Sequence, residues 1–229
     1  MRIDRFLKFL PSIEKTIEAA NLDHIVMGLG PTAWLLPHMR QSLLRNIRFT
    51  GAHDAFRIRP VHDLVIFDQP LDELNPDSER HHHITMAEPE RLFAYEPRVR
   101  DWHAYLPHRL REMIQPVPMH VWNGPKCTGH EPFELIADPI HTIAVSPTGC
   151  TTLAWKNGAR RIGVIGADMM HGHHRSSALH HQVDAFFTKI SRQAFDAGGL
   201  ILNLSPVTSL QSFAICSHAM LSGESKVGS

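Results

Sequence analysis

Small and polar residues stand directly after several short apolar runs of this sequence, where they could contact a ligand. They are Gly28, Gly30 and Thr32 at and after residues 24–28, Asp54 after 47–50, Asp68 after 64–67, Ser146 and Thr148 after 142–145, and Asp168 after 162–165. Short apolar, β-branched runs predict buried parallel strands. The carboxyl ends of such strands meet at one edge of a sheet, where ligands bind in open α/β folds. We therefore expect these residues to line one cleft.

The segment 141–170 reads as one complete strand–helix–strand unit. Ser146 is suited to the N-cap of its helix, with Pro147 in the first helical position, where its missing N–H costs nothing. Gly158 can take the left-handed conformation that ends a helix. The second strand of the unit leads through Gly166 to Asp168, which is predicted either to face a ligand or to cap the next segment.

The glycine-rich turn after the first run is a second candidate site. Its sequence, Gly28-Leu29-Gly30-Pro31-Thr32, lies between a predicted strand and a predicted helix over 33–45. Free backbone N–H groups at such a helix start suit a phosphate. The turn lacks the third glycine of the dinucleotide fingerprint and the Walker lysine, so a plain tight turn is the alternative.

The pattern predicts an α/β fold, Rossmann-like and doubly wound, with a mainly parallel sheet and helices on both faces. The expected strands are 24–28, 47–50, 64–67, 142–145, 162–165 and 200–204, and further helices are expected over 3–22, 101–114 and 182–197. Residues 1–229 are read as a single domain. Its proline-rich middle, 70–140, is expected to be a loop-rich insertion or lid with weak strands near 84–87 and 119–122. Residues 218–229 are expected to form a flexible tail.

Composition narrows the functional class. The 229 residues contain no run of 18 apolar residues and no secretory signal, so neither a membrane span nor export is expected. Three cysteines without a CxxC pair predict reduced thiols and a cytoplasmic protein. The 23 basic and 23 acidic residues balance, which argues against non-specific nucleic-acid binding. A homo-oligomer is compatible with these features.

Several motifs occur here in an order that resembles the bacterial and phage superfamily of sialyltransferase-like and 6-hydroxymethylpterin diphosphokinase-like proteins. They are GLGPT after the first strand, GAHDAF after the second, VSPTGCTTLAWKNGARRIGVIGAD, a histidine-bearing loop, and NLSP at the last strand. The resemblance covers about two thirds of the chain. It implies a nucleotide at the strand ends, contacted by Gly28, Gly30, Pro31, Thr32, His53, Asp54, Ser146 and Thr148.

Three departures from the family pattern bear on the donor. Leu29 and His53 replace asparagines, and Pro147 replaces a glycine. Each replaced group would have touched the nucleotide, so the departures do not favour CMP-sialic acid. The resemblance still implies a nucleotide sugar as donor and a hydroxyl group as acceptor.

The histidines supply a candidate catalyst. Neutral imidazole can take the acceptor proton near neutral pH. The resembling transferases carry their base near the position of His180 and His181, which are expected to precede a helix. We prefer His181, with a surface or capping role as the alternative, and we expect Asp168 beside it in the catalytic set. His171, His173 and His174 match no fixed zinc spacing, so no metal ligand is predicted and no cofactor is required.

Two other functions stay open. A diphosphokinase acting on a pterin-like substrate would need Mg²⁺, which Asp54, Asp68 and Asp168 could hold. A degenerate relative would keep the fold and lose catalysis, as the changes at Leu29, His53 and Pro147 suggest. Nucleotide binding that depends on Mg²⁺ would favour the diphosphokinase. Failure to bind any nucleotide would favour the degenerate relative.

Overall fold

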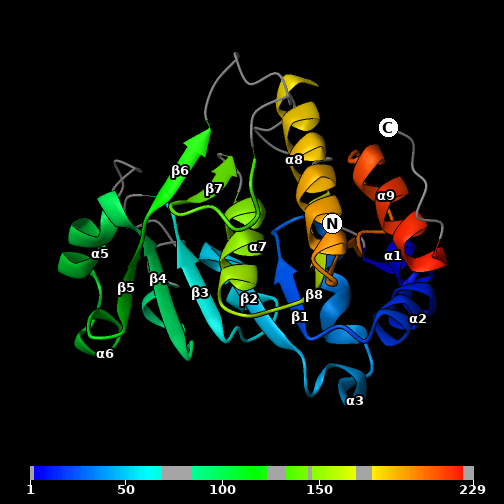
Figure 1. The fold of residues 1–229 in the computed structure, drawn as a ribbon. Coiled ribbons are helices and arrows are strands. Elements are labelled where there is room, and N and C mark those ends of the chain that lie inside the picture. The colour runs from blue at the N-terminus through cyan, green and yellow to red at the C-terminus, as the bar shows by residue number, and fades with distance from the viewer. Residues whose placement is uncertain (1–2, 69–83, 123–132, 144–145, 169–176, 224–229) are drawn as a thin grey trace.

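A seven-stranded sheet forms the centre of the protein in a computed structural model that describes residues 3–68, 84–122, 133–143, 146–168 and 177–223 (Figure 1). The strand order is β5-β4-β3-β2-β1-β8-β9, and every neighbouring pair is parallel. The strands are β1 His24–Met27, β2 Arg48–Ala52, β3 Asp63–Ile66, β4 Arg91–Tyr95, β5 Ile114–Val117, β8 Arg161–Ile165 and β9 Leu200–Asn203. The predicted α/β class with a mainly parallel, Rossmann-like sheet is confirmed.

Five of the six expected strands lie in this sheet, as β1, β2, β3, β8 and β9. The sixth does not. Residues 140–143 form β7 (Ile140–Ile143), which pairs with β6 (Met119–Trp122) in a separate two-stranded parallel sheet. β7 therefore leads into the helix of the 141–170 unit from outside the central sheet.

Most connections between the strands contain helices. They are α1 Asp4–Leu7, α2 Leu10–Ala20, α3 Gln41–Leu44, α5 Val99–Tyr105, α6 His108–Arg111, α7 Ser146–Lys156, α8 Ser177–Asp196 and α9 Gln211–Ser222, with 3₁₀ helices η1 Pro31–His38, η2 His53–Arg57 and η3 Glu96–Arg98. α7 ends at Lys156, and Gly158 follows it in the predicted left-handed conformation, with φ of +100°. The expected helix over 33–45 is instead the 3₁₀ helix η1 followed by the short α3.

The segment expected to be a loop-rich insertion contributes two strands of the central sheet, β4 and β5. Ile84 and Thr85 form a helical turn where a strand was expected. The expected helix over 101–114 breaks at Pro107 into α5 and α6, and its last residue begins β5. In the predicted tail, residues 218–222 are instead the end of α9, while residues 224–229 lie outside the described residues.

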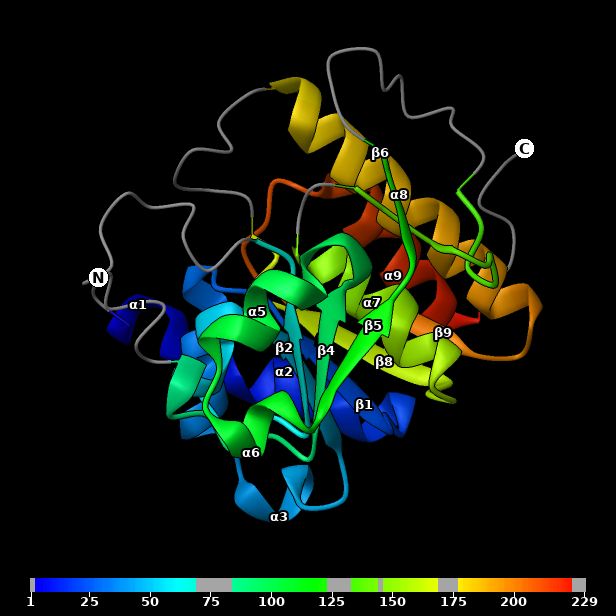
Figure 2. The same ribbon diagram turned by 90° about the vertical axis from the view of Figure 1, so that its left-hand side faces the viewer.

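The sheet is buried on both faces. Ile25 and Met27 of β1 belong to an apolar cluster with α2 and η1, whereas Val26 belongs to a second cluster with α7 and α8. Successive side chains of a strand point to opposite faces, so this alternation places α2 and α7 on opposite sides. Figure 2 shows the same separation, with α1 and α2 on one side and α7 and α8 on the other. None of the described helices is long and apolar enough to cross a membrane.

A buried polar network lies at the edge of the sheet where the amino-terminal ends of the strands meet. Asp63 is fully buried and receives two hydrogen bonds of 2.7 Å from the guanidinium group of Arg91. Thr50 lies between Asp63 and His24, with its Oγ1 3.3 Å from the carboxylate and 2.7 Å from His24 Nε2. Burial lowers the pKa of His24 to about 4, so its ring is neutral at pH 7.

Candidate functional site at the carboxyl edge of β1 and β8

The strand order reverses at β1. From β1 the chain continues through β2, β3, β4 and β5 toward one side of the sheet, and later places β8 and β9 on the other side. Such a switch point leaves a crevice at the carboxyl ends of the two strands, which is where open α/β sheets bind ligands. The turn 28–32 and residues 166–168 both lie at this point.

A hydrogen-bonded cluster joins three segments at the switch point. Asp168 Oδ2 accepts a 2.8 Å hydrogen bond from the backbone N–H of Thr32, and Asp168 Oδ1 accepts one from the Thr32 hydroxyl. Thr32 Oγ1 also lies 3.0 Å from Ser205 Oγ, just after β9. All three residues are buried. The cluster therefore fixes the turn after β1 against the ends of β8 and β9.

Gly166 completes this cluster from the end of β8. Its N–H lies 3.1 Å from both Thr32 Oγ1 and Ser205 Oγ, and its carbonyl accepts a 2.8 Å hydrogen bond from Gly30. A Cβ atom added to Gly30 would lie 2.7 Å from Asp168 Oδ2, and one added to Gly28 would overlap the Gly166 carbonyl. The glycines of the turn are therefore required by close packing against β8.

This arrangement corrects the predicted phosphate cradle at the glycine-rich turn. The N–H of Thr32 is used by Asp168, that of Gly30 by Gly166, and that of Ala33 by the Gly30 carbonyl at 3.1 Å. A buried carboxylate thus occupies the position at the start of η1 where a phosphate was expected. The carboxylate of Asp168, which was expected in the catalytic set, is buried and hydrogen-bonded to Thr32.

The first turn of α7 lies across the carboxyl ends of β1 and β3. A Cβ atom added to Gly28 would lie 3.0 Å from Pro147 Cγ, and one added to Gly149 would lie 2.7 Å from the Phe67 ring. Ser146, half-buried, begins the helix. The amino-terminal end of a helix carries partial positive charge and orphan N–H groups. α7 therefore presents an anion-attracting end at the edge that holds Gly28.

Thr148 was predicted to contact a ligand, but it points into the protein. Its side chain is fully buried, lies 2.8 Å from Thr142 Oγ1, and donates a 3.1 Å hydrogen bond to the Ile143 carbonyl. These contacts hold α7 against β7. Cys150, two residues further along α7, is also fully buried, and burial raises the pKa of its thiol well above its usual value.

His53 and Asp54 begin η2 at the carboxyl end of β2. His53 is buried in a left-handed conformation with φ of +48°, which is uncommon for a residue with a side chain. Its Nε2 lies 3.4 Å from Asp68 Oδ2, and its ring lies 6.1 Å from that of Phe67. Asp54 is half-buried beside it. The ring of Phe67 thus lies between His53 and the first turn of α7.

The two candidate bases lie within α8, not before it as expected. His181 is exposed, whereas His180 is half-buried. His180 Nε2 is itself buried and has no hydrogen-bond partner among the described residues. Of the two histidines, His180 is the one with a buried ring nitrogen that lacks a partner in the described ranges, and His181 is exposed to solvent.

No group of three histidine, cysteine or acidic residues in the described ranges could hold a metal ion. Asp54, Asp68 and Asp168 follow three different strands, β2, β3 and β8. His171, His173 and His174 lie outside the described residues.

Comparison with known proteins gives one distant likeness. No family model matches the chain, and no curated protein matches it. Among solved structures, it is similar to the sialyltransferase CstII from Campylobacter jejuni, determined with the substrate analogue CMP-3FNeuAc. The TM-score is 0.46 and the sequence identity 11%, over 84% of each chain. This likeness is too distant to carry a functional inference.

Sequence reasoning missed the role of Ser205. It named the NLSP segment at the last strand but did not place its serine in the site. A signal was present, because Ser205 follows an apolar strand as Asp168 follows β8. Ser209 was missed as well; its N–H and hydroxyl lie 3.1 and 3.2 Å from the Asp168 carbonyl.

Proposed function

We propose that the protein is a glycosyltransferase that binds a nucleotide sugar at the carboxyl edge of β1 and β8 and transfers the sugar to a hydroxyl group. One observation carries the proposal: Thr32, Asp168 and Ser205, from three of the motif segments, meet in one cluster at the switch point of the sheet. The order of the motifs resembles the order in nucleotide-sugar transferases, which supports the same function.

The donor phosphates are assigned to the start of α7. The N–H groups at the start of η1 are used by the protein, whereas α7 begins with the half-buried Ser146 next to Gly28. Phosphate groups are favoured at a helix amino terminus by its N–H groups and its dipole. Leu29, half exposed beside this position, offers an apolar contact for the nucleoside.

His180 is proposed as the base. It would take the proton of the acceptor hydroxyl as that oxygen attacks the anomeric carbon and the nucleotide departs. Its buried Nε2 is the atom assigned to this transfer. Thr32 and Asp168 then act by holding the turn after β1 in shape, and they do not exchange protons with the substrate.

Donor binding can be tested by the thermal unfolding of the full chain with a panel of nucleotides and nucleotide sugars. A ligand at 100 times its dissociation constant stabilises the folded state by about 2.7 kcal/mol. Ser146→Asp should abolish this stabilisation by repelling phosphate, while leaving the unliganded protein at least as stable, because a carboxylate is favourable at a helix start.

Gln211→Glu is the matched control, since it adds the same charge at the exposed start of α9. It should leave nucleotide binding unchanged. If no nucleotide stabilises the wild-type protein, the donor proposal fails, and the result supports the alternative of a relative that has lost catalysis. Binding that survives Ser146→Asp would place the phosphates elsewhere.

A further inference from the structure

Arginines gather at the edge of the sheet opposite the candidate donor site. The segment 24–62 contains five arginines and one acidic residue, Asp54, which follows β2 at the carboxyl edge. Arg40, Arg45 and Arg48 flank α3 and begin β2. Figure 1 shows α3 at the end of the molecule where the strands begin. The segment thus brings an excess of positive charge to the amino-terminal edge, which acids of other segments must balance.

Two of the five arginines are balanced in this way. Arg40 lies 2.8 Å from Glu14 and 2.6 Å from Glu18, both on α2. Arg48 lies 2.9 Å from Glu90, just before β4. The other three arginines form no ion pair with a carboxylate of the described residues. An anion from outside the chain can therefore serve as their counter-charge.

Arg59 is the best held of these three arginines. It is half-buried, and the carbon of its guanidinium group lies 4.6 Å from the centre of the Phe49 ring. Its Nη1 donates a 2.9 Å hydrogen bond to Gln41 Oε1, and Gln41 in turn donates to the Met39 carbonyl at 3.2 Å. The ring and the amide together hold the guanidinium plane in one orientation, so little order is lost when an anion binds.

The charge of Arg59 is only partly compensated. Burial lowers the pKa of Arg59, whereas hydrogen bonds to Asp63 raise the pKa of Arg91. The Nε–H and Nη2–H groups of Arg59 donate to no atom in the part of the chain that the structure describes. In a guanidinium group this pair of donors can bind two oxygens of one anion side by side. Arg59 is therefore suited to an oxyanion.

A second guanidinium group lies on the same face of α3. Arg45 follows Gln41 by four residues in helical conformation, so their Cβ atoms are about 5–6 Å apart. Because Gln41 bonds to Arg59, the exposed side chain of Arg45 can approach the same anion. Two positive charges suit a phosphate group, which carries about −1.5 to −2 at pH 7, better than a carboxylate with a single charge.

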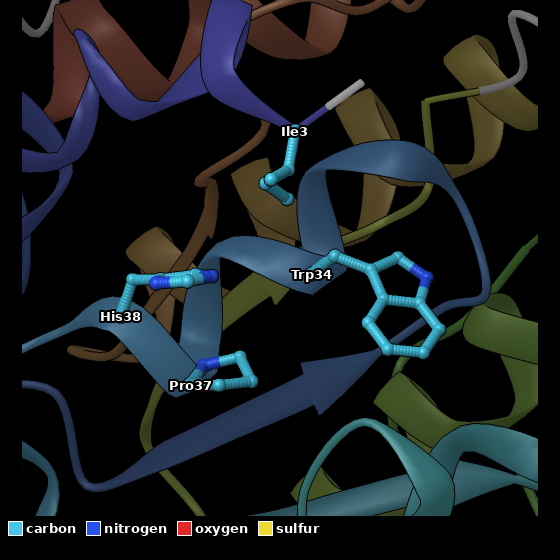
Figure 3. A pocket seen from close by; sticks show the side chains of 4 residues that line it. All are labelled: Ile3, Trp34, Pro37 and His38. Carbon is cyan, nitrogen blue, oxygen red and sulfur yellow. The ribbon is translucent and has the colours of Figure 1, made fainter. Parts of the chain in front are cut away.

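The cavity along η1 is a separate feature. It has a volume of about 570 Å³ and is lined by Ile3, Trp34, Pro37 and His38 (Figure 3). Arg59 and its partner Gln41 do not contribute to this lining. The Arg59 guanidinium group instead lies at the surface, where a phosphate group can reach it directly.

We infer that Arg59 and Arg45 form a second anion site, which binds a phosphate group of a small molecule at the amino-terminal edge of the sheet. Arg59 binds two phosphate oxygens through Nε–H and Nη2–H, and Arg45 adds the second positive charge. The site lies at the opposite edge from the start of α7. It therefore does not depend on the proposed transferase function.

Isothermal titration of the full chain with inorganic phosphate and with pyrophosphate tests this site, at pH 7 and at an ionic strength held constant with sodium chloride. Arg59→Gln should weaken binding by about tenfold or more, because it removes two charge-assisted hydrogen bonds. Arg59→Lys, which keeps the charge without the paired donors, should retain part of the affinity. Arg5→Gln is the matched control, since Arg5 also lies over a ring, that of Phe6 at 5.2 Å, and should change nothing.

Ser146→Asp separates this site from the donor site. It should leave phosphate binding at Arg59 intact, even if nucleotide binding is lost or never observed. Three results would reject the inference: no phosphate binding beyond the effect of sodium chloride, equal affinity in Arg59→Gln and the wild type, or a loss of phosphate binding in Ser146→Asp alone. Circular dichroism checks the fold of each variant. If Arg59→Gln does not fold, unchanged affinity in both Arg59→Lys and Arg45→Gln rejects the site.

Discussion

The buried carboxylate of Asp168 accepts hydrogen bonds from both the backbone N–H and the hydroxyl of Thr32, 136 residues earlier in the chain. Two bonds to one residue fix the direction of η1 as well as its position. Removal of either partner leaves the other polar group buried without its bond, which costs more than the net value of a hydrogen bond.

Thr32→Val should therefore lower the free energy of unfolding by about 2 kcal/mol, since it keeps the side-chain volume and removes the hydroxyl. Combined with Asp168→Asn, its effect should be clearly less than additive, because the two groups act on each other. Urea denaturation of the single and double variants measures both quantities. Thr152→Val is the control: Thr152 is equally buried but bonds only to carbonyls of its own helix. Additive effects would show that the Thr32–Asp168 contact contributes little.

Gly28→Ala should destabilise the protein by about 3 kcal/mol, because the new Cβ would overlap the Gly166 carbonyl at the junction of β1 and β8. Gly158→Ala offers a comparison in open space, where the cost is only the left-handed backbone, about 1 kcal/mol. Thermal unfolding of both variants ranks them. An equal loss at the two positions would mean that the backbone near Gly28 can move aside.

Stability should fall as the pH decreases from 6.5 toward 4, because of His24. The unfolded chain binds a proton on this ring near pH 6.5, whereas the folded protein does so only near pH 4. The unfolded state therefore gains protons first, and the loss approaches ~3 kcal/mol at pH 4. His24→Gln should remove this part of the slope. The measurement is the difference between wild-type and variant unfolding free energies at each pH, and a constant difference would contradict it.

His180→Ala should retain nucleotide stabilisation and lose about 10² to 10⁴ in turnover, which is the usual contribution of a positioned general base. His181→Ala, at the exposed neighbour, is the matched control and should keep near-normal turnover. Release of the nucleotide from the donor that stabilises the protein gives the rate. Full activity of both variants would exclude a histidine base at this site. Loss of nucleotide binding in His180→Ala would indicate that His180 contacts the donor instead.

The sequence predicted the strands that cross the middle of the sheet and missed two near its edge. β1 and β8 are continuous apolar runs, buried on both faces, and their pattern is clear. β5 contains Pro116, one of the prolines of the segment 70–140, but an edge strand tolerates proline because one side of its backbone has no strand to bond. β4 begins with Arg91, whose charge is explained by the Asp63 partner that sequence alone cannot reveal.

The site was predictable in position and less so in detail. Gly30 and Asp168 lie together, as strand polarity required. The use of the N–H groups in the turn was not predictable, because it depends on a contact between segments far apart in sequence. Thr148 shows the same limit: a hydroxyl in the first turn of a helix can face a ligand or the interior, and only the position of β7 decides it.

The central place of β1 has a consequence for biosynthesis. One edge of β1 pairs with β2 soon after both emerge from the ribosome, but the other edge pairs His24 with Ile162 and stays open until β8 is made. Parallel pairings this distant in sequence form slowly and expose strand edges meanwhile. Nascent chains that stall before residue 161 should therefore bind chaperones or aggregate, and ligand binding should emerge only once β9 and Ser205 have left the exit tunnel.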